Sequence, residues 1–439
     1  MKTLLPLLFL FLFTTCNSKS SPASEEGDNG QMPCIDLAGN LNNTVPSLPL
    51  SEAVGKVDIV PLETTSKSFI RRIEDIKVTA HDIFVFDINE GVFRFDRQGK
   101  FLNKVGKKGE GPEEILSIWQ MMIKEAEQEV YLYSITDKNC IKVYNFDGSF
   151  NRVALQGRME NVFYGPSNQI FSFKNHFFLQ QTLPVLRIEN KPEIWSFALT
   201  DSCFNIQKKF YNPSLAGKDE EIIENCAPYY GWKKYWSEGR TAIDTYDQQL
   251  VMKYAGVDTL YRYNESNQNF EPYYTLLSGE QPPFDMAHVW VKDAAFFKYL
   301  WVYDFYDTQK YLYLLAGKSN VVHTFRYDKE NGEVRVSKKE SAIIERPFPG
   351  SPNFVFRELK KRFELQNDLS GGIVFTVDYK SQGKYWIDEC NPSDLLEQID
   401  PDELKTEEVK DKPARDKLVQ VLSKVMEEDN PVLFIATLK

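Results

Sequence analysis

The stretch VGKKGEGPEEI, from Val105 to Ile115, combines three glycines and two lysines, the residue types of a phosphate-binding loop. A nucleotide-binding loop of the form G-x-x-x-x-G-K-[ST] places its lysine after the last glycine, between a strand and a helix. Here both lysines precede Gly109, a proline follows Gly111, and the flanking segments have the pattern of strands. The stretch therefore does not predict nucleotide binding. We expect its glycines to allow positive φ angles where the chain crosses between two strand-rich units.

A second group of residues could bind a ligand if the fold brings them to the mouth of a central channel. Arginine can bind a carboxylate through two parallel hydrogen bonds, and tryptophan offers a flat face for stacking, so a carboxylated sugar or a peptide would fit such a group. In the structural alternative, arginine and acid side chains pair with one another around a polar channel, and the tryptophan fills an interface between sheets. The group consists of Arg71, Arg72, Glu74, Trp119, Arg240, Asp244, Asp304 and Asp368.

Metal and nucleophile chemistry have weaker support in the sequence. The four histidines are far apart and none lies in an H-E-x-x-H pattern, and the serine motif G-x-S-x-G does not occur. The cysteines are scattered without a C-x-x-C pair. Oxygen ligands of the kind that calcium prefers are present, for example Glu74, Asn367 and Asp368. We therefore expect no catalytic residue and no cofactor, with calcium left open.

Composition excludes some classes of partner. The chain has 439 residues, of which 42% are hydrophobic and 14% aromatic, enough to bury a large core. Its formal net charge is -11, and it contains no long basic run. Because nucleic-acid binding requires a concentrated basic face, we expect no nucleic-acid partner.

The first residues have the form of a secretion signal. Lys2 precedes an apolar run from Leu4 to Phe13 that is too short to span a bilayer, and the tetrapeptide FTTC ends at Cys16. This tetrapeptide resembles a loose bacterial lipobox. We expect a signal peptide over residues 1–15 and lipid attachment at Cys16, and hence an outer-membrane lipoprotein that faces the periplasm or the cell surface. The alternative is an ordinary cleavage site with a chance cysteine.

The remaining chain divides into a tether and an all-β region. Residues 16–45 begin with a Ser-, Pro- and acid-rich segment and are expected to form a flexible tether, whereas residues 46–439 contain short alternating strands and glycine turns. The clearest unit, residues 73–106, contains four strands, with Phe84 and Phe86 facing the opposite side from Val85. Aligning Gly99 with Gly148 reveals a repeat of about 50 residues, typical of propeller blades. Counting such units predicts a six-bladed β-propeller.

The C-terminal region predicts a helix and then a strand. Leu418, Leu422, Val425 and Met426 share one helical face, with Pro413 in the first turn. After Asn430-Pro431, the run VLFIATL predicts a final strand. We expect this strand to pair with VDIVPLE, residues 57–63, and so to close the ring without exposed edges.

Five sequence motifs, in order along the chain, resemble the six-bladed β-propeller lipoproteins common in Bacteroidota. They are VDIVPLETT, GKFLNKVGKKGEGPEEI, GVDTLYRYN, NDLSGGIVFTVD and EEDNPVLFIATLK. The similarity covers residues 57–439. It implies a propeller fold and an envelope location, but no catalytic residue, because that family is largely without an assigned biochemical role.

We therefore expect a lipid-anchored binding or protein-interaction module whose partner is an envelope protein or a glycan. The aromatic-rich segment CAPYYGWKKYWSEGR, residues 226–240, would then be an exposed docking loop or a long connection between blades. The alternative function is a calcium-dependent propeller enzyme, similar to lactonases or uronate lyases, that acts at the central channel. Fold alone does not decide between binding and catalysis.

Overall fold

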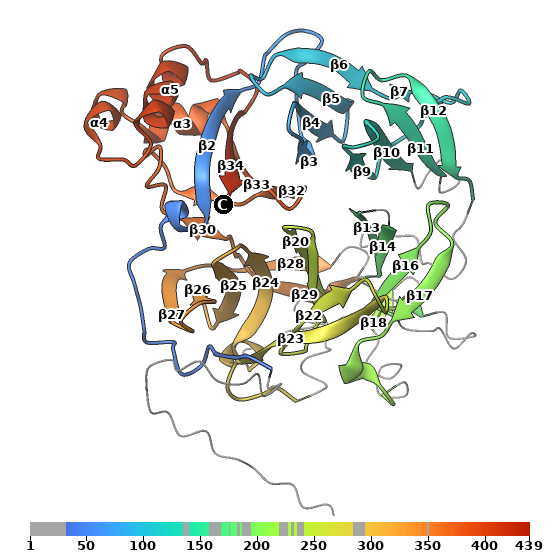
Figure 1. Ribbon diagram of the computed structural model, residues 1–439, viewed down its shortest axis with the longest axis vertical. Helices are drawn as coiled ribbons and strands as arrows, with labels where there is room; N and C mark the ends of the chain where they lie inside the picture. The colour runs from blue at the N-terminus through green and yellow to red at the C-terminus, as the bar shows by residue number, and fades with distance from the viewer. Residues whose placement is uncertain are drawn as a thin grey trace, which may run out of the picture. The chain divides into compact units, whose positions relative to one another are not determined.

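The computed structural model describes residues 32–134, 140–157, 168–174, 176–181, 185–186, 195–218, 227–229, 232–234, 241–283, 295–348 and 351–439. Within the compact unit Pro33–Lys439, six antiparallel sheets lie around a central axis (Figure 1). Each blade has four antiparallel strands, from an inner strand at the axis to an outer strand at the rim. The predicted six-bladed β-propeller is confirmed.

The first three blades follow the chain in order. Blade 1 is β3 (Ile73–Val78), β4 (Asp82–Asp87), β5 (Gly91–Asp96) and β6 (Phe101–Val105). Blade 2 is β9 (Gln120–Lys124), β10 (Glu129–Ser134), β11 (Cys140–Asn145) and β12 (Phe150–Leu155). Blade 3 is β13 (Asn168–Phe173), β14 (His176–Gln181), β16 (Phe197–Thr200) and β17 (Ile206–Phe210).

Among the last three blades, blades 4 and 6 each include a strand from the N-terminal region, whereas blade 5 does not. Blade 4 is β20 (Ala242–Tyr246), β21 (Gln249–Lys253), β22 (Thr259–Asn264) and β23 (Asn269–Leu277), with β1 (Cys34–Asp36) added in parallel to β23. Blade 5 is β24 (Trp301–Asp307), β25 (Tyr311–Lys318), β26 (Val321–Asp328) and β27 (Val334–Glu340). Blade 6 is β32 (Tyr379–Ser381), β33 (Tyr385–Cys390), β34 (Val432–Leu438) and β2 (Val54–Pro61).

Pairing between the two ends of the chain closes the ring. β2 lies antiparallel to β34, with Val57 opposite Ala436 and Ile59 opposite Phe434. Blade 6 therefore takes three strands from the C-terminal region and its outer strand from the N-terminal region, as the sequence predicts. Leu433 and Ile435 of β34 also pack in one cluster with residues of blade 1.

Strands inside the blades are buried on both faces. In β4, Phe84 and Phe86 pack toward blade 2, and Phe84 meets the ring of Phe146 edge to face at 4.7 Å between centroids. Val85 belongs instead to the cluster shared with blade 6. The alternation predicted for these side chains is confirmed, and it explains why the four central residues of β4, Ile83 to Phe86, are aromatic or β-branched.

Equivalent glycine turns seat each blade against its neighbour. Gly99, between β5 and β6, has φ +86°, and a Cβ there would lie 2.1 Å from the carbonyl oxygen of Pro61 in blade 6. Gly148, in the corresponding turn of blade 2, has φ +90°, and its Cβ would lie 2.4 Å from the carbonyl oxygen of Lys104 in blade 1. The repeat found in the sequence therefore marks a contact between blades.

Three helices connect β33 to β34, where the sequence analysis expected one helical segment. They are α3 (Pro392–Gln398), α4 (Pro401–Thr406) and α5 (Lys412–Leu422). Pro413 lies in the first turn of α5 as expected, and Leu418 and Leu422 are buried. The helix ends at Leu422. Val425, beyond that end, still packs against the same core cluster as Leu418 and Leu422, whereas Met426 is 64% exposed. None of the described helices combines enough length and apolar character to span a bilayer.

The ordered unit begins before the expected boundary at residue 46. Ile35 in β1 and Leu37 after it are fully buried against blades 4 and 5. Farther along, a short 3-10 helix, η1 (Leu50–Glu52), leads into β2. Part of the expected tether is therefore a strand of blade 4, because its alternating apolar residues find an unpaired edge at β23. Residues 16–31 of that tether, including Cys16, lie outside the described residues.

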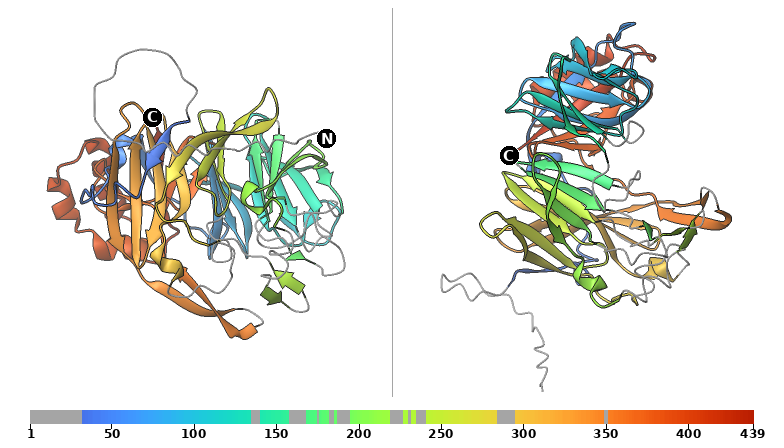
Figure 2. Two further views of the ribbon diagram at one scale, coloured as in Figure 1. Left: turned by 90° about the horizontal axis from the view of Figure 1, so that it is seen from below. Right: turned by 90° about the vertical axis from the view of Figure 1, so that its right-hand side faces the viewer.

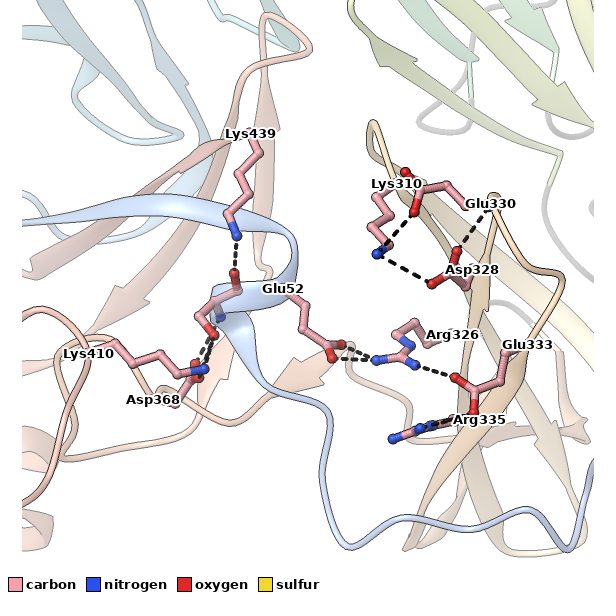
Figure 3. A network of polar contacts seen from close by, with 11 residues as sticks. Glu52, Lys310, Arg326, Asp328, Glu330, Glu333, Arg335, Asp368, Lys410 and Lys439 are labelled. Atoms are coloured by element: carbon pink, nitrogen blue, oxygen red, sulfur yellow. Dashed lines mark hydrogen bonds and ion pairs between the residues drawn. The ribbon is translucent and has the colours of Figure 1, made fainter.

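A polar clamp fixes η1 between two blades (Figure 3). Arg326 of β26 pairs with Glu52, and its guanidinium lies 4.7 Å from the ring centroid of Tyr311. On the other side, the Ser51 amide donates to Asp368 at 2.9 Å, and Lys410 pairs with the same carboxylate at 2.8 Å. These contacts hold the segment that enters the closing strand.

The remaining described elements are short pieces and one long hairpin. They are β7 (Lys107–Lys108), β8 (Glu114–Ile115), β15 (Val185–Leu186), β18 (Ala227–Tyr229), β19 (Trp232–Lys234), β28 (Ile343–Phe348), β29 (Ser351–Leu359), β30 (Glu364–Leu365), β31 (Phe375–Thr376), η2 (Pro213–Leu215) and η3 (Phe296–Lys298).

The glycine contact predicts a graded loss of stability. Gly332→Ala, at φ +74° with no atom within 4 Å of the added Cβ, should cost only the left-handed backbone penalty of roughly 1–2 kcal/mol. Gly99→Ala adds a clash with the backbone of blade 6 and should cost roughly 1–3 kcal/mol more. Urea unfolding at equilibrium measures both. Equal costs in the two variants would contradict the proposed contact between blades.

Candidate functional site

A cavity of about 1530 Å³ follows the propeller axis and is lined by all six inner strands. One lining residue from each inner strand, from β3 to β32 in order, is Glu74, Gln120, Ile170, Asp244, Asp304 and Lys380. The lining extends along these strands into the turns at Lys174, Asp247 and Gln382. The cavity is therefore a long channel whose walls are strand side chains.

The two faces of the ring differ in the length of their connections. On one face, here called the turn face, the inner strands pass to the second strands and the third to the fourth through short turns such as 97–100 and 308–310. The opposite face, here called the loop face, carries the crossings between blades and the helical connection of residues 391–431. The β28–β29 hairpin, orange in Figure 2, projects from the loop face, away from the end of the chain marked C. The longer connections are thus concentrated on one face.

Four of the eight residues predicted to form a ligand face line the cavity. They are Glu74, Trp119, Asp244 and Asp304. Trp119 is 40% exposed, so it does not fill an interface between blades as the structural alternative assumed. Arg240 lies outside the described residues.

Arg71 and Arg72 do not line the cavity but lie at its rim on the loop face. Their backbone amides donate to the Asp87 carboxylate at 2.6 and 2.7 Å. The side chain of Arg72 pairs with Glu74 at 2.8 Å. The predicted pairing of arginine with acid is therefore present at this position, and it holds one of the cavity residues.

Asp368 and Asn367 lie away from the cavity. Asp368 belongs to the clamp on η1, and Asn367 holds a tight turn by accepting from the Ser370 amide at 3.0 Å. The candidate calcium ligands Glu74, Asn367 and Asp368 are therefore not brought together. Within the described residues, no three His, Cys, Asp or Glu side chains lie close enough together to hold a metal ion.

Lys380 is the central charge of the channel wall, and the sequence analysis did not identify it. Its ammonium donates to the Phe305 carbonyl at 2.8 Å, and it lies 3.5 Å from Asp244 and 3.7 Å from Asp304. It also lies 3.8 Å from the ring centroid of Tyr306. One lysine of blade 6 thus binds groups from blades 4 and 5. Only ring closure brings β32 to this place, so a local sequence pattern gave no signal for it.

Burial makes several carboxyl groups of this wall difficult to ionise. It raises the pKa of Asp244 to about 6, although the Lys380 ammonium and the amide of Asp307, which donates at 2.9 Å, favour the charged form. Burial likewise raises the pKa of Asp378 and of its neighbour Asp388, which accepts from the Thr376 amide at 2.8 Å. Blades 4 to 6 therefore carry buried carboxyl groups that keep their protons more readily than exposed ones do.

Side-chain hydrogen bonds also link neighbouring inner strands. The Ser381 hydroxyl accepts from the Val78 amide and donates to the Val78 carbonyl, both at 2.8 Å, and so joins β32 to β3. The Gln120 amide group makes the equivalent pair of bonds to Ile170, at 2.7 and 2.9 Å, and joins β9 to β13. Part of the polar lining thus has a structural role.

The glycine-rich stretch between Val105 and Ile115 connects the outer strand of blade 1 to the inner strand of blade 2, as the sequence predicts. Only Gly106 of its three glycines has a positive φ, +76°. Gly109 lies close to the Glu114 side chain, because a Cβ there would lie 2.0 Å from its carboxylate, the movable end of that side chain. Lys107 forms an ion pair with this same carboxylate.

The pKa of Asp244 predicts a pH-dependent stability. Because the pKa is raised on folding from 3.8 to about 6, its contribution is fully present below pH 4 and is lost as pH rises through 6. The wild type loses this contribution between pH 4 and pH 8, whereas Asp244→Asn does not. The free energy of unfolding of the variant minus that of the wild type should therefore be more positive at pH 8 than at pH 4, by on the order of 3 kcal/mol.

Denaturant titrations across this pH range measure the difference. Asp304→Asn is the control, because it removes a carboxylate that faces the same lysine but whose side chain is 36% exposed. A difference between Asp244→Asn and the wild type that does not change with pH would contradict the assignment.

Comparisons with known proteins support the fold and identify a family. A candidate exported protein of Bacteroides fragilis NCTC 9343 matches with a TM-score of 0.56 at 13% identity, over 93% of this chain and all of that one. A member of the DUF4221 family from Bacteroides vulgatus matches with a TM-score of 0.42 at 13% identity, over 72% of this chain and 98% of that one. No curated protein matches in sequence. The family model of the domain of unknown function DUF4934 matches residues 32–437, so the chain belongs to the DUF4934 family.

Proposed function

We propose that the chain is a binding module of the cell envelope that takes its ligand in the central channel from the loop face. The observation that carries this proposal is the cavity of about 1530 Å³, which reaches all six blades. Its volume exceeds the roughly 300–1,000 Å³ typical of small-molecule sites, so a ligand of several units fits it.

The inner strands that form the channel are fixed relative to one another, which favours ligand binding. The inner strands are joined by the hydrogen bonds of Ser381 and Gln120 and by the ion pairs of Lys380. A rigid site loses little conformational entropy when a ligand enters, which favours affinity. The loop face carries the longer connections between strands, and loops held on a rigid scaffold often carry the residues that bind a ligand.

The lining suits a ligand with polar groups of several kinds. Acidic and basic side chains both line the cavity, for example Glu74 and Lys361, and Trp119 offers an exposed aromatic face at the rim. A glycan or an exposed segment of an envelope protein has this mixed character. Since Glu74, Asn367 and Asp368 do not meet, no observation favours the calcium-dependent enzyme, and calcium enters only as one arm of the ligand screen.

The envelope location rests on the N-terminal sequence. A short apolar run followed by FTTC supports export and lipid attachment at Cys16, and the matching Bacteroides fragilis protein is itself named as a candidate exported protein. Lipid attachment would hold the domain at the outer membrane, where envelope glycans and proteins are its available partners.

The cavity proposal is tested by a thermal-shift screen of residues 32–439 against neutral and acidic oligosaccharides, peptides and calcium, because a ligand that binds the native state raises the melting temperature. For any ligand that stabilises the domain, Trp119→Ala should weaken binding roughly tenfold by calorimetry. Leu102→Ala is the matched control, since Leu102 is similarly exposed but lies on β6, outside the cavity lining. Equal loss in both variants would place the ligand elsewhere.

Lipid attachment predicts a simple fractionation result. In cells that process bacterial lipoproteins, the full chain should remain with the membranes, and Cys16→Ala should release it to the soluble fraction. Cys34→Ala, a change in an exposed cysteine of β1, is the control and should stay with the membranes. Membrane association that survives Cys16→Ala would exclude the anchor.

A further inference from the structure

One part of the cavity wall differs from the charged wall of blades 4 to 6. Gln180, Trp195 and Ser196 line the cavity from blade 3, and none carries a charge. We refer to these three residues as the blade 3 wall. The register of β14 with β16 sets Gln180 opposite Phe197, at the loop-face end of the blade where Trp195 and Ser196 lead into β16. Gln180 bonds to Thr241 on the side of blade 4, whereas Trp195 packs in the cluster that blade 3 shares with blade 2.

The indole of Trp195 has an unused hydrogen-bond donor. Its side chain is 1% exposed, and among the described residues its Nε1 has no acceptor. A buried donor without a partner costs roughly 1–3 kcal/mol, so such groups are rare unless a ligand or water completes them. By contrast, the buried Trp301 donates from its Nε1 to the Phe296 carbonyl at 2.9 Å.

The neighbours of Trp195 supply acceptors. Gln180 donates its Nε2 to the Thr241 carbonyl at 2.5 Å, which fixes its side chain and directs its amide group. In the part of the chain that the structure describes, its Oε1 has no hydrogen-bond donor. The Ser196 hydroxyl also has no described partner, although the Ser196 backbone is held by its amide, which donates to Phe210 at 2.9 Å.

We propose that the blade 3 wall binds a hydroxyl group of a neutral saccharide. This proposal rests on the channel being a binding site and names the chemical class of its ligand. A sugar ring carries several hydroxyls, each of which can accept and donate. One hydroxyl can therefore accept from the Trp195 indole while another donates to Gln180 or Ser196.

Geometry and charge favour a saccharide over a peptide at this wall. A peptide amide presents its carbonyl and its N–H on opposite sides, whereas a hydroxyl offers an acceptor and a donor at one oxygen. An ionised ligand group would meet no opposite charge among these three residues and would lose its hydration without compensation. Leu215 and Ala242 also line the cavity, and apolar side chains of this kind contact the C–H faces of a sugar ring.

The test follows the Trp195 indole by NMR in the ¹⁵N-labelled domain. Trp195→Phe keeps the ring but removes the N–H, and so assigns its resonance. The domain is titrated with glucose, galactose, xylose, N-acetylglucosamine, cellobiose and chitobiose, and separately with tri-alanine. We expect the Trp195 resonance to shift with at least one saccharide. The affinity for that saccharide should fall about tenfold in Trp195→Phe, as expected for one lost hydrogen bond.

Controls separate this proposal from the broader one. Trp301→Phe removes an indole donor that is already paired within the chain, and it should leave saccharide affinity unchanged. A saccharide that shifts the Trp119 resonance but not that of Trp195 would overturn the assignment of the blade 3 wall and leave the cavity as a binding site. A Trp195 shift with tri-alanine alone would overturn the saccharide assignment in favour of a peptide. No Trp195 shift with any saccharide would also overturn it.

Discussion

The pairing of β2 with β34 is the constraint on which the rest of the structure depends. It makes the outer strand of blade 6 from the N-terminal region and thereby sets β32 beside β3 and beside the inner strands of blades 4 and 5. Without that pairing, β34 would present an open edge, and the cluster that joins Leu433 and Ile435 to blade 1 would lose its support. The clamp of Glu52 with Arg326 and of Ser51 with Asp368 holds the strand that completes this pairing.

A closed ring gives the channel two chemically different walls. On the side of blades 4 to 6, Lys380, Asp244 and Asp304 form a mutually paired network. At the loop-face end of blade 3, Gln180, Trp195 and Ser196 are uncharged, and the Trp195 donor is left without a partner in the described chain. The charged wall thus contributes rigidity, whereas the uncharged wall contributes unused hydrogen-bonding capacity. Unused hydrogen-bonding groups can contribute binding energy, and rigidity keeps the site preorganised.

The sequence predicted those features that local pattern controls. Alternating side chains in β4, the turn glycines Gly99 and Gly148, and the apolar runs that become β2 and β34 all follow from period, turn chemistry and chain position. The helical connection was only partly predicted. Of its three short helices, only α5 was predicted, from Pro413 and the apolar spacing of Leu418 and Leu422, whereas the shorter α3 and α4 were not.

The site was predicted less well, for a physical reason. Glu74, Trp119, Asp244 and Asp304 were placed at the channel because they fall on or just before inner strands. Asp368 was misplaced because it lies in a turn that contacts η1, a contact across more than 300 residues of sequence. Lys380 has its role because groups of two other blades surround it, and Trp195 because its indole finds no acceptor among the described residues. Neither relation can be recognised from the spacing of residues in the sequence.

The most direct test of the central role of closure is native-state hydrogen exchange in low concentrations of denaturant. If the β2–β34 pairing holds the ring together, amides of β2 and β34 should exchange with the same free energy and denaturant dependence as those of β4 and β25, because they open only when the whole propeller unfolds. If β2 instead opens at a much lower free energy while the inner blades stay protected, the ring is stable without its closing strand, and the β2–β34 pairing is not the constraint that holds the propeller together.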